Sequence, residues 1–157
     1  MLKKFFNKPI IVFCFVFYLL TTLLIFISSL TDGEISGEQS AFVWSILSTI
    51  LNIEGNYELF IRKILGHFFC FLVLAIFATV VYYRLVEILF TTYKSFWFVF
   101  ITLLVGLLTA IFSEILQLPL FVDGRNGNFL DIVIDFCGYF LGFILLRFVI
   151  YRKVKNQ

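Results

Sequence analysis

Charged residues are scarce in this sequence. Asp, Glu, Lys and Arg make up 14% of its 157 residues, whereas they make up roughly a quarter of an ordinary soluble domain. Hydrophobic residues account for 62%, and the mean hydropathy is +1.06. This composition excludes a soluble domain and predicts an integral membrane protein, with one domain at this length.

Cysteine is also scarce, and nucleotide-binding motifs are missing. The cysteines Cys14, Cys70 and Cys137 lie far apart in apolar runs, and no CxxC pair occurs. This pattern excludes a disulfide framework and a cysteine zinc site. The sequence has no phosphate-binding glycine loop and no basic patch with interleaved aromatic residues, and its net charge is only +2. We therefore expect no nucleotide cofactor and no nucleic-acid partner.

Four apolar stretches are present, over about residues 9–30, 64–83, 96–118 and 131–150. The first has 22 residues, which at 1.5 Å per residue extends about 33 Å and covers a bilayer core of about 30 Å. A cleaved signal peptide also has lysines before an apolar run. This run is long for one and lacks a clear small-residue cleavage site, so we expect a retained helix.

A fifth apolar stretch, residues 41–53, is too short to span a membrane. We expect a short interfacial helix in the first extracytoplasmic loop, with Trp44 near the lipid headgroups. A short helix packed on the bundle is an equal alternative. The predicted fold is therefore all-α and polytopic, with four transmembrane helices and this additional helix.

Lys and Arg are distributed unequally between the two sides of the membrane. With four spans, the side that holds both termini carries nine of them and the other side carries three. The positive-inside rule then places both termini in the cytoplasm. Membrane lipids are the expected partners, and the sequence does not indicate an oligomeric state.

This topology gathers nearly all polar residues of the spans in the outer layer of the membrane, with Arg147 as the exception, since its side chain can reach the cytoplasmic surface. Asp131, Asp135, Gly138 and Gly142 share one stripe of the fourth span. A second seam of small residues, including Gly106, follows the third span, so we expect spans three and four to meet along these seams. The candidate ligand-binding residues are Arg62, Lys63, His67, Glu114, Gln117, Arg125, Asp131 and Asp135.

An acid inside a span costs about 2.5–3.5 kcal/mol unless it is protonated, paired or hydrated. One interpretation is an ion-pair network in which Arg125, Arg62 or Lys63 neutralises the acids Glu114 and Asp131 and fixes the outer loop. The other is a polar pocket that opens outward and receives a ligand.

His67 could act as a general base or as a hydrogen-bonded structural group. A metal site made by His67, Glu114 and Asp131 has suitable ligand types but no diagnostic spacing. The sequence therefore predicts no metal.

The polar motifs form an ordered set, from Arg62-Lys63-x-x-x-His67 through Glu114-x-x-Gln117, Gly124-Arg125 and Asp131 to Gly138-x-x-x-Gly142. This set resembles the VanZ family of bacterial membrane proteins. Asp135 departs from the pattern, in which Asn is expected. The resemblance implies a location in the bacterial plasma membrane and a family associated with low-level resistance to teicoplanin. It also places the family's polar signature on Arg62, Lys63, His67, Glu114, Gln117, Arg125 and Asp131.

Three functions fit these observations. The first is binding or modulation of a cell-envelope ligand by the outer pocket, where the ligand is a lipid head group, a cell-wall precursor or a lipoglycopeptide. The second is a membrane enzyme that uses Glu114 and His67 for acid–base chemistry on an envelope lipid. The third is a transporter or structural partner, which ranks last because transport paths usually carry polar residues near the midplane.

Overall fold

All regular structure in the described part of the chain is helical. The computed structural model describes residues 8–51, 62–90 and 94–155, without the side chains of residues 51, 62, 65 and 150–155. Within these residues, four helices are long and apolar enough to cross a membrane, which confirms the predicted number of spans and shows a multi-pass membrane protein. These spans are α1 (Lys8–Ser29), the segment Gly66–Leu89 formed by η2 (Arg62–Phe69) and α4 (Cys70–Leu89), α5 (Lys94–Leu116), and the first part of α6 (Phe129–Lys155).

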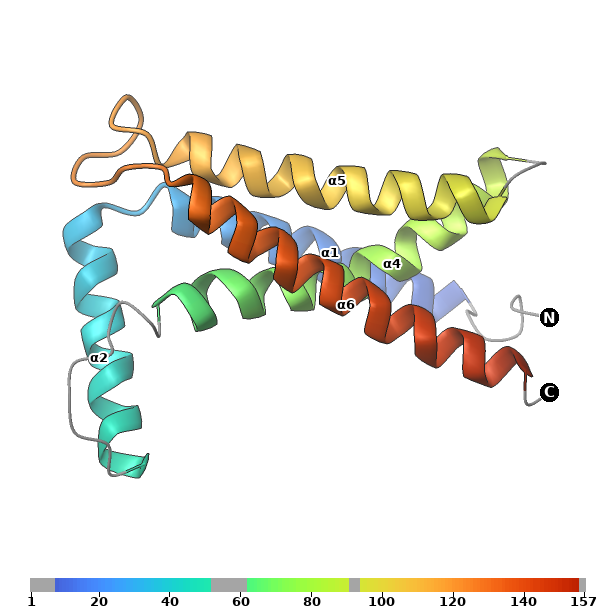
Figure 1. The fold of residues 1–157 in the computed structure, drawn as a ribbon, viewed down its shortest axis with the longest axis horizontal. Coiled ribbons are helices and arrows are strands. Elements are labelled where there is room, and N and C mark those ends of the chain that lie inside the picture. The colour runs from blue at the N-terminus through green and yellow to red at the C-terminus, as the bar shows by residue number, and fades with distance from the viewer. Residues whose placement is uncertain (1–7, 52–61, 91–93, 156–157) are drawn as a thin grey trace.

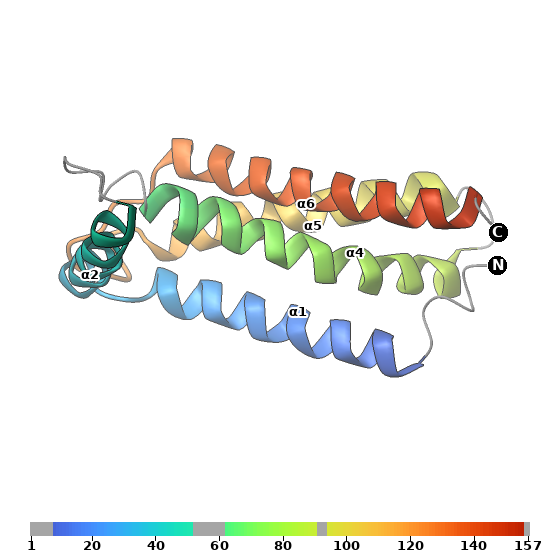
Figure 2. The same cartoon turned by 90° about the horizontal axis from the view of Figure 1, so that it is seen from below.

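The four spans form a bundle in which α4 is central (Figures 1 and 2). It packs against α1, α5 and α6. Its buried residues Phe71, Leu74, Ala75 and Ala78 form the main core with Tyr139 of α6. The beginning of α1 and the end of α6 lie at one end of the bundle, and α2 lies at the other (Figure 1).

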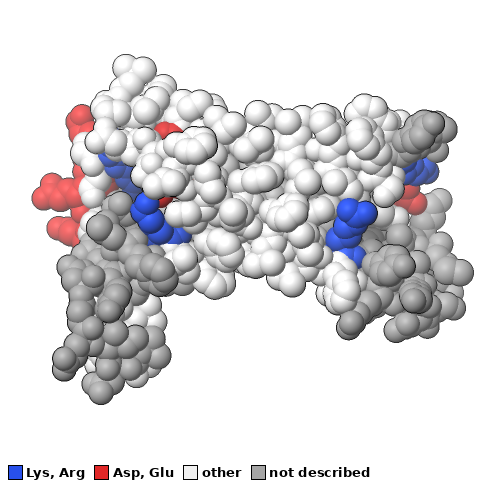
Figure 3. Space-filling view, viewed as in Figure 1, with Lys and Arg blue, Asp and Glu red and all other residues white. Residues whose placement is uncertain are grey.

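The bundle surface has the distribution that a lipid environment requires. On the face shown in Figure 3, charged side chains lie towards the two ends and a wide uncharged belt lies between them. Large apolar side chains such as Leu24 and Phe13 are exposed, whereas Thr79, Thr102 and Ser113 are buried. The hydroxyls of these three residues donate to backbone carbonyls one turn earlier in their own helices, so each of them is paired inside the bundle.

The glycines of α6 allow very close helix contacts, but with a different partner from the one predicted. A Cβ atom at Gly138 would lie 2.2 Å from the Phe68 carbonyl oxygen, and one at Gly142 would lie 2.4 Å from that of Leu72. The prediction that these glycines face the third span is therefore wrong, because they pack on the second span. Gly106 does meet α6, where the ring of Tyr139 covers it.

The helix in the first loop is longer than predicted. It is α2 (Gly33–Leu51), which begins well before residue 41. Asp32 explains the early start, since its Oδ1 accepts a hydrogen bond from the Glu34 backbone N–H at 2.8 Å and caps the helix. The helix runs across the direction of the spans (Figure 1), and Phe42, Ile46 and Ile50 are exposed on it. Its interfacial position stays a prediction.

The second span also extends further than predicted. It was predicted to end at about residue 83, but α4 continues through Arg84 and Glu87 to Leu89. No glycine or proline interrupts the helix there, and the two side chains form an ion pair at i, i+3. The third span ends at Leu116, so Gln117 lies just beyond α5.

The contact at Gly138 can be tested with an alanine substitution. Gly138→Ala should destabilise the protein by about 1–3 kcal/mol, since the added methyl group forces α6 away from the Phe68 carbonyl. Gly37→Ala is the control, because no atom of the described residues lies within 4 Å of a Cβ atom there. Unfolding in detergent micelles measures both variants, and equal stability of the two would contradict this packing.

Candidate functional site

The candidate site residues from the sequence gather at the end of the bundle near α2 (Figure 1). We call this set the polar cluster. Its members come from η2, the end of α5, the following loop and the start of α6, and their side chains are joined by the hydrogen bonds and ion pairs described below. Arg62 is the first residue of η2, and its side chain lies outside the described part. The cluster comprises Lys63, His67, Glu114, Gln117, Arg125, Asp131 and Asp135.

The segment that carries Lys63 and His67 is a π-helix, η2. Such segments are rare, usually short, and frequent at functional sites. The wider turns change the angular spacing of side chains, so the i, i+4 relation of an α-helix does not describe these two residues. Lys63 reaches Asp131, whereas His67 points between the helices α5 and α6.

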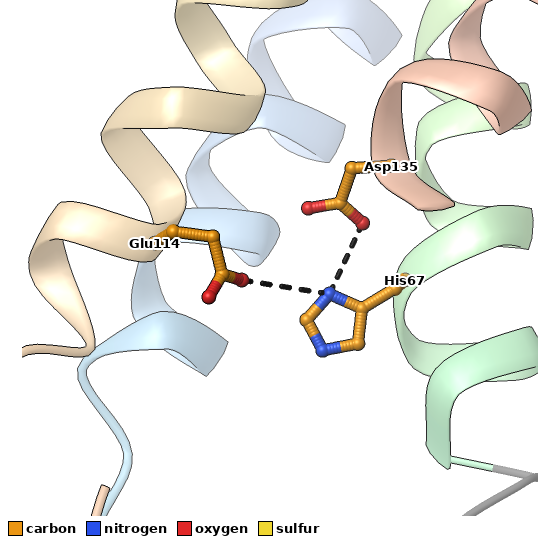
Figure 4. Close-up of side chains that lie close together, drawn as sticks. All are labelled: His67, Glu114 and Asp135. Atoms are coloured by element: carbon orange, nitrogen blue, oxygen red, sulfur yellow. Dashed lines mark hydrogen bonds and ion pairs between the residues drawn. The ribbon is translucent and has the colours of Figure 1, made fainter. Parts of the chain in front are cut away.

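His67 lies between two carboxylates from different helices (Figure 4). Its Nδ1 lies 3.0 Å from Oδ1 of Asp135 and 3.8 Å from Oε1 of Glu114. The side chain of Asp135 is fully buried, that of Glu114 is 4% exposed and that of His67 is 16% exposed. The imidazole is therefore the member of this triad that is open to the surroundings.

Glu114 also holds the loop between α5 and α6. Its Oε1 accepts a hydrogen bond from Nε2 of Gln117 at 2.9 Å, and its Oε2 accepts one from the Asn128 backbone N–H at 2.8 Å. Arg125 Nη1 donates to Oε1 of Gln117 at 3.0 Å. The loop passes so close that a Cβ at Gly127 would lie 2.5 Å from the Glu114 carbonyl oxygen. The buried carboxylate of Glu114 thus holds Gln117 and the Asn128 backbone amide directly, and it holds Arg125 through Gln117.

The two aspartates of α6 have separate partners. Asp131 Oδ1 lies 2.8 Å from Nζ of Lys63, so this predicted ion pair is present. Asp135 faces inward, where its Oδ2 lies 3.5 Å from the Ser113 hydroxyl. The described side chains of the cluster therefore contain three carboxyl groups and two permanent cations, and the imidazole is the remaining group that could carry positive charge.

Two contributors were not recognised as site residues in the sequence. Ser113 is one of them, since its hydroxyl borders Asp135. Asn128 is the other, since its backbone N–H donates to Glu114 and its Oδ1 accepts from the Leu130 N–H at 3.0 Å and caps α6. Asn128 directly precedes an apolar run, and an Asn at such a position is a common helix N-cap, so the sequence did contain an indication of this role.

The structure also changes the set of residues that could hold a metal. His67, Glu114 and Asp135 each offer a ligand atom, and these atoms lie within 4.8 Å of one another. The set considered from the sequence contained Asp131 instead. Asp131 faces Lys63, and Asp135, one turn further along α6, takes its place.

The loop-holding role of Glu114 predicts a local effect of its removal. In Glu114→Ala, amide hydrogen exchange of residues 117–128 should become faster, because the loop loses two hydrogen bonds worth about 1–3 kcal/mol together. Glu87→Ala, at the opposite end of the bundle, is the control. Unchanged exchange in this loop would show that Glu114 does not hold it.

The comparisons with known proteins add no relative. The chain matches no protein-family model, no curated protein and no solved structure. The resemblance to the VanZ family consequently stays a prediction that rests on the polar motifs.

Proposed function

We propose that this chain is a VanZ-like protein of the bacterial plasma membrane whose polar cluster binds or modulates a cell-envelope ligand. The observation that carries the proposal is a set of buried acids, Glu114, Asp131 and Asp135, that meets Lys63 and His67 at one end of the bundle. Ionisable residues inside spans are costly and usually serve a function. Apolar side chains fill the bundle below the cluster, whereas transport paths usually carry polar residues near the midplane, so transport is the less supported function.

The chemistry of the cluster suits a polar head group with a negative charge. Lys63 is 30% exposed and Arg125 is partly exposed, so both cations border the surroundings. Such cations attract phosphate or carboxylate groups near a membrane surface. Asp131 and Gln117 lie beside them and can accept hydrogen bonds from hydroxyl or ammonium groups. Lipid head groups, cell-wall precursors and lipoglycopeptides share these features.

The proposed orientation places the polar cluster in the outer leaflet. The beginning of α1 and the end of α6 lie at the opposite end of the bundle (Figure 1). The sequence has an excess of Lys and Arg at that end, which favours a cytoplasmic location for both termini. With both termini cytoplasmic, the cluster faces the side on which envelope ligands and glycopeptide antibiotics occur.

A second candidate function is a membrane enzyme, favoured by the position of the His67 imidazole between two carboxylates. Such an arrangement can accept and donate a proton near neutral pH. In this version, His67 and Glu114 act on an envelope lipid held at the same cluster.

Antibiotic susceptibility tests the binding proposal. A teicoplanin-sensitive bacterium would express the wild type, Glu114→Ala or Arg125→Ala at matched membrane levels. The wild type should lower susceptibility to teicoplanin, and both variants should lose that protection, since each removes a member of the cluster. Arg84→Ala and Glu87→Ala, which remove a matched pair of charges at the other end, should keep it.

Two outcomes decide between the candidates. Equal protection by the wild type and both cluster variants would remove the cluster from any resistance role. The envelope lipids and cell-wall precursors of the same cells would be profiled for the wild type and His67→Ala. A species that accumulates or disappears only with intact His67 favours the enzyme, and identical profiles contradict it.

A further inference from the structure

The triad of His67, Glu114 and Asp135 has the spacing of a metal site. A Zn²⁺ ion bound at about 2.0–2.2 Å to each ligand places neighbouring ligand atoms roughly 3.3 Å apart. Nδ1 of His67 lies 3.0 Å from one carboxylate oxygen and 3.8 Å from another. All three ligand atoms fall within 4.8 Å of one another. Side-chain shifts of about 1 Å would bring them to coordination distances.

From this geometry we propose that His67, Glu114 and Asp135 bind a divalent transition-metal ion, with Zn²⁺ as the best match. One imidazole nitrogen and two carboxylate oxygens form a mixed set that Zn²⁺ accepts, whereas Mg²⁺ and Ca²⁺ prefer oxygen ligands alone. Two carboxylates balance the charge of a divalent ion in a medium of low dielectric constant. Three protein ligands leave a coordination position for water or a ligand.

The residues around the triad already hold both carboxylates in place. The second oxygen of Glu114 accepts the Asn128 backbone N–H, and its Oε1 accepts the Gln117 amide. The Ser113 hydroxyl lies beside the second oxygen of Asp135. Metal sites commonly have such outer partners, which orient the ligands. In a membrane interior, this arrangement restricts both acids to the orientation that faces His67.

The three ligands come from η2, α5 and α6, so a bound ion would join three of the four spans (Figure 4). The close contact at Gly138 sets the distance between two of these elements. His67 is the most exposed member, so the ion would enter beside the imidazole. Asp135, which departs from the VanZ-like pattern, supplies the third ligand. The metal site goes beyond the proposed function because it needs no envelope ligand.

Metal binding to the purified full-length protein tests the proposal. Protein in detergent micelles, stripped with a chelator, would be titrated with Zn²⁺ and its metal content measured after buffer exchange. The wild type should retain about one Zn²⁺ per chain. His67→Ala and Asp135→Asn should weaken binding by more than about tenfold, since they remove ligands. Glu87→Gln should bind as the wild type does, and Mg²⁺ should not compete.

The single histidine of the chain gives a second readout that needs no variant. In protein labelled with ¹⁵N-histidine, all imidazole signals come from His67, and Zn²⁺ should shift the Nδ1 signal. Lower pH should weaken binding, because protons compete for the imidazole. An unmoved histidine signal, or Zn²⁺ retained equally by all variants, would overturn the proposal. The triad would then be an ion-pair network held by a proton, and the susceptibility test would still decide the role of the cluster.

Discussion

The contact between α6 and the start of the second span depends on Gly138. Its backbone lies so close to the Phe68 carbonyl that even a methyl group would collide with it. Asp135 lies on the same face of α6, one turn earlier, and this proximity brings its carboxylate to His67. A wider separation of the helices would leave a buried carboxylate without its partner, at a considerable cost in the membrane. The close contact at Gly138 and the pairing of Asp135 with His67 therefore both depend on the short distance between α6 and the start of the second span.

The residues of the polar cluster both stabilise this end of the bundle and supply its ionisable groups. Glu114 accepts hydrogen bonds from the Gln117 side chain and the Asn128 backbone amide and so holds the loop. Its Oε1 also faces His67. The structural network considered in the sequence analysis is therefore present around Glu114, and the ligand pocket stays a proposal for the same side chains. Buried acids with fixed donors are restricted in orientation, and that restriction is what a binding or metal site requires.

The sequence predicted the four spans because uninterrupted apolar runs of this length have few alternatives in a chain with so little charge. It also placed the acids on one stripe of the last span, since helical periodicity assigns residues to a face. Periodicity does not identify the neighbour of that face. The glycine stripe borders the second span rather than the third, and Asp135 rather than Asp131 meets His67, because both outcomes depend on how the helices pack. The π-helical geometry of η2 and the early start of α2 at Asp32 likewise follow from local contacts that periodicity does not specify.

A double-mutant cycle between His67 and Asp135 tests the central claim most directly. The free energy of unfolding would be measured in micelles, in the presence of a chelator, for the wild type, His67→Ala, Asp135→Asn and the double variant. Direct contact predicts a coupling of about 0.5–3 kcal/mol between the two substitutions. Effects that add to within about 0.5 kcal/mol would show that the two side chains do not interact, and would contradict the arrangement of α6 against η2 described above.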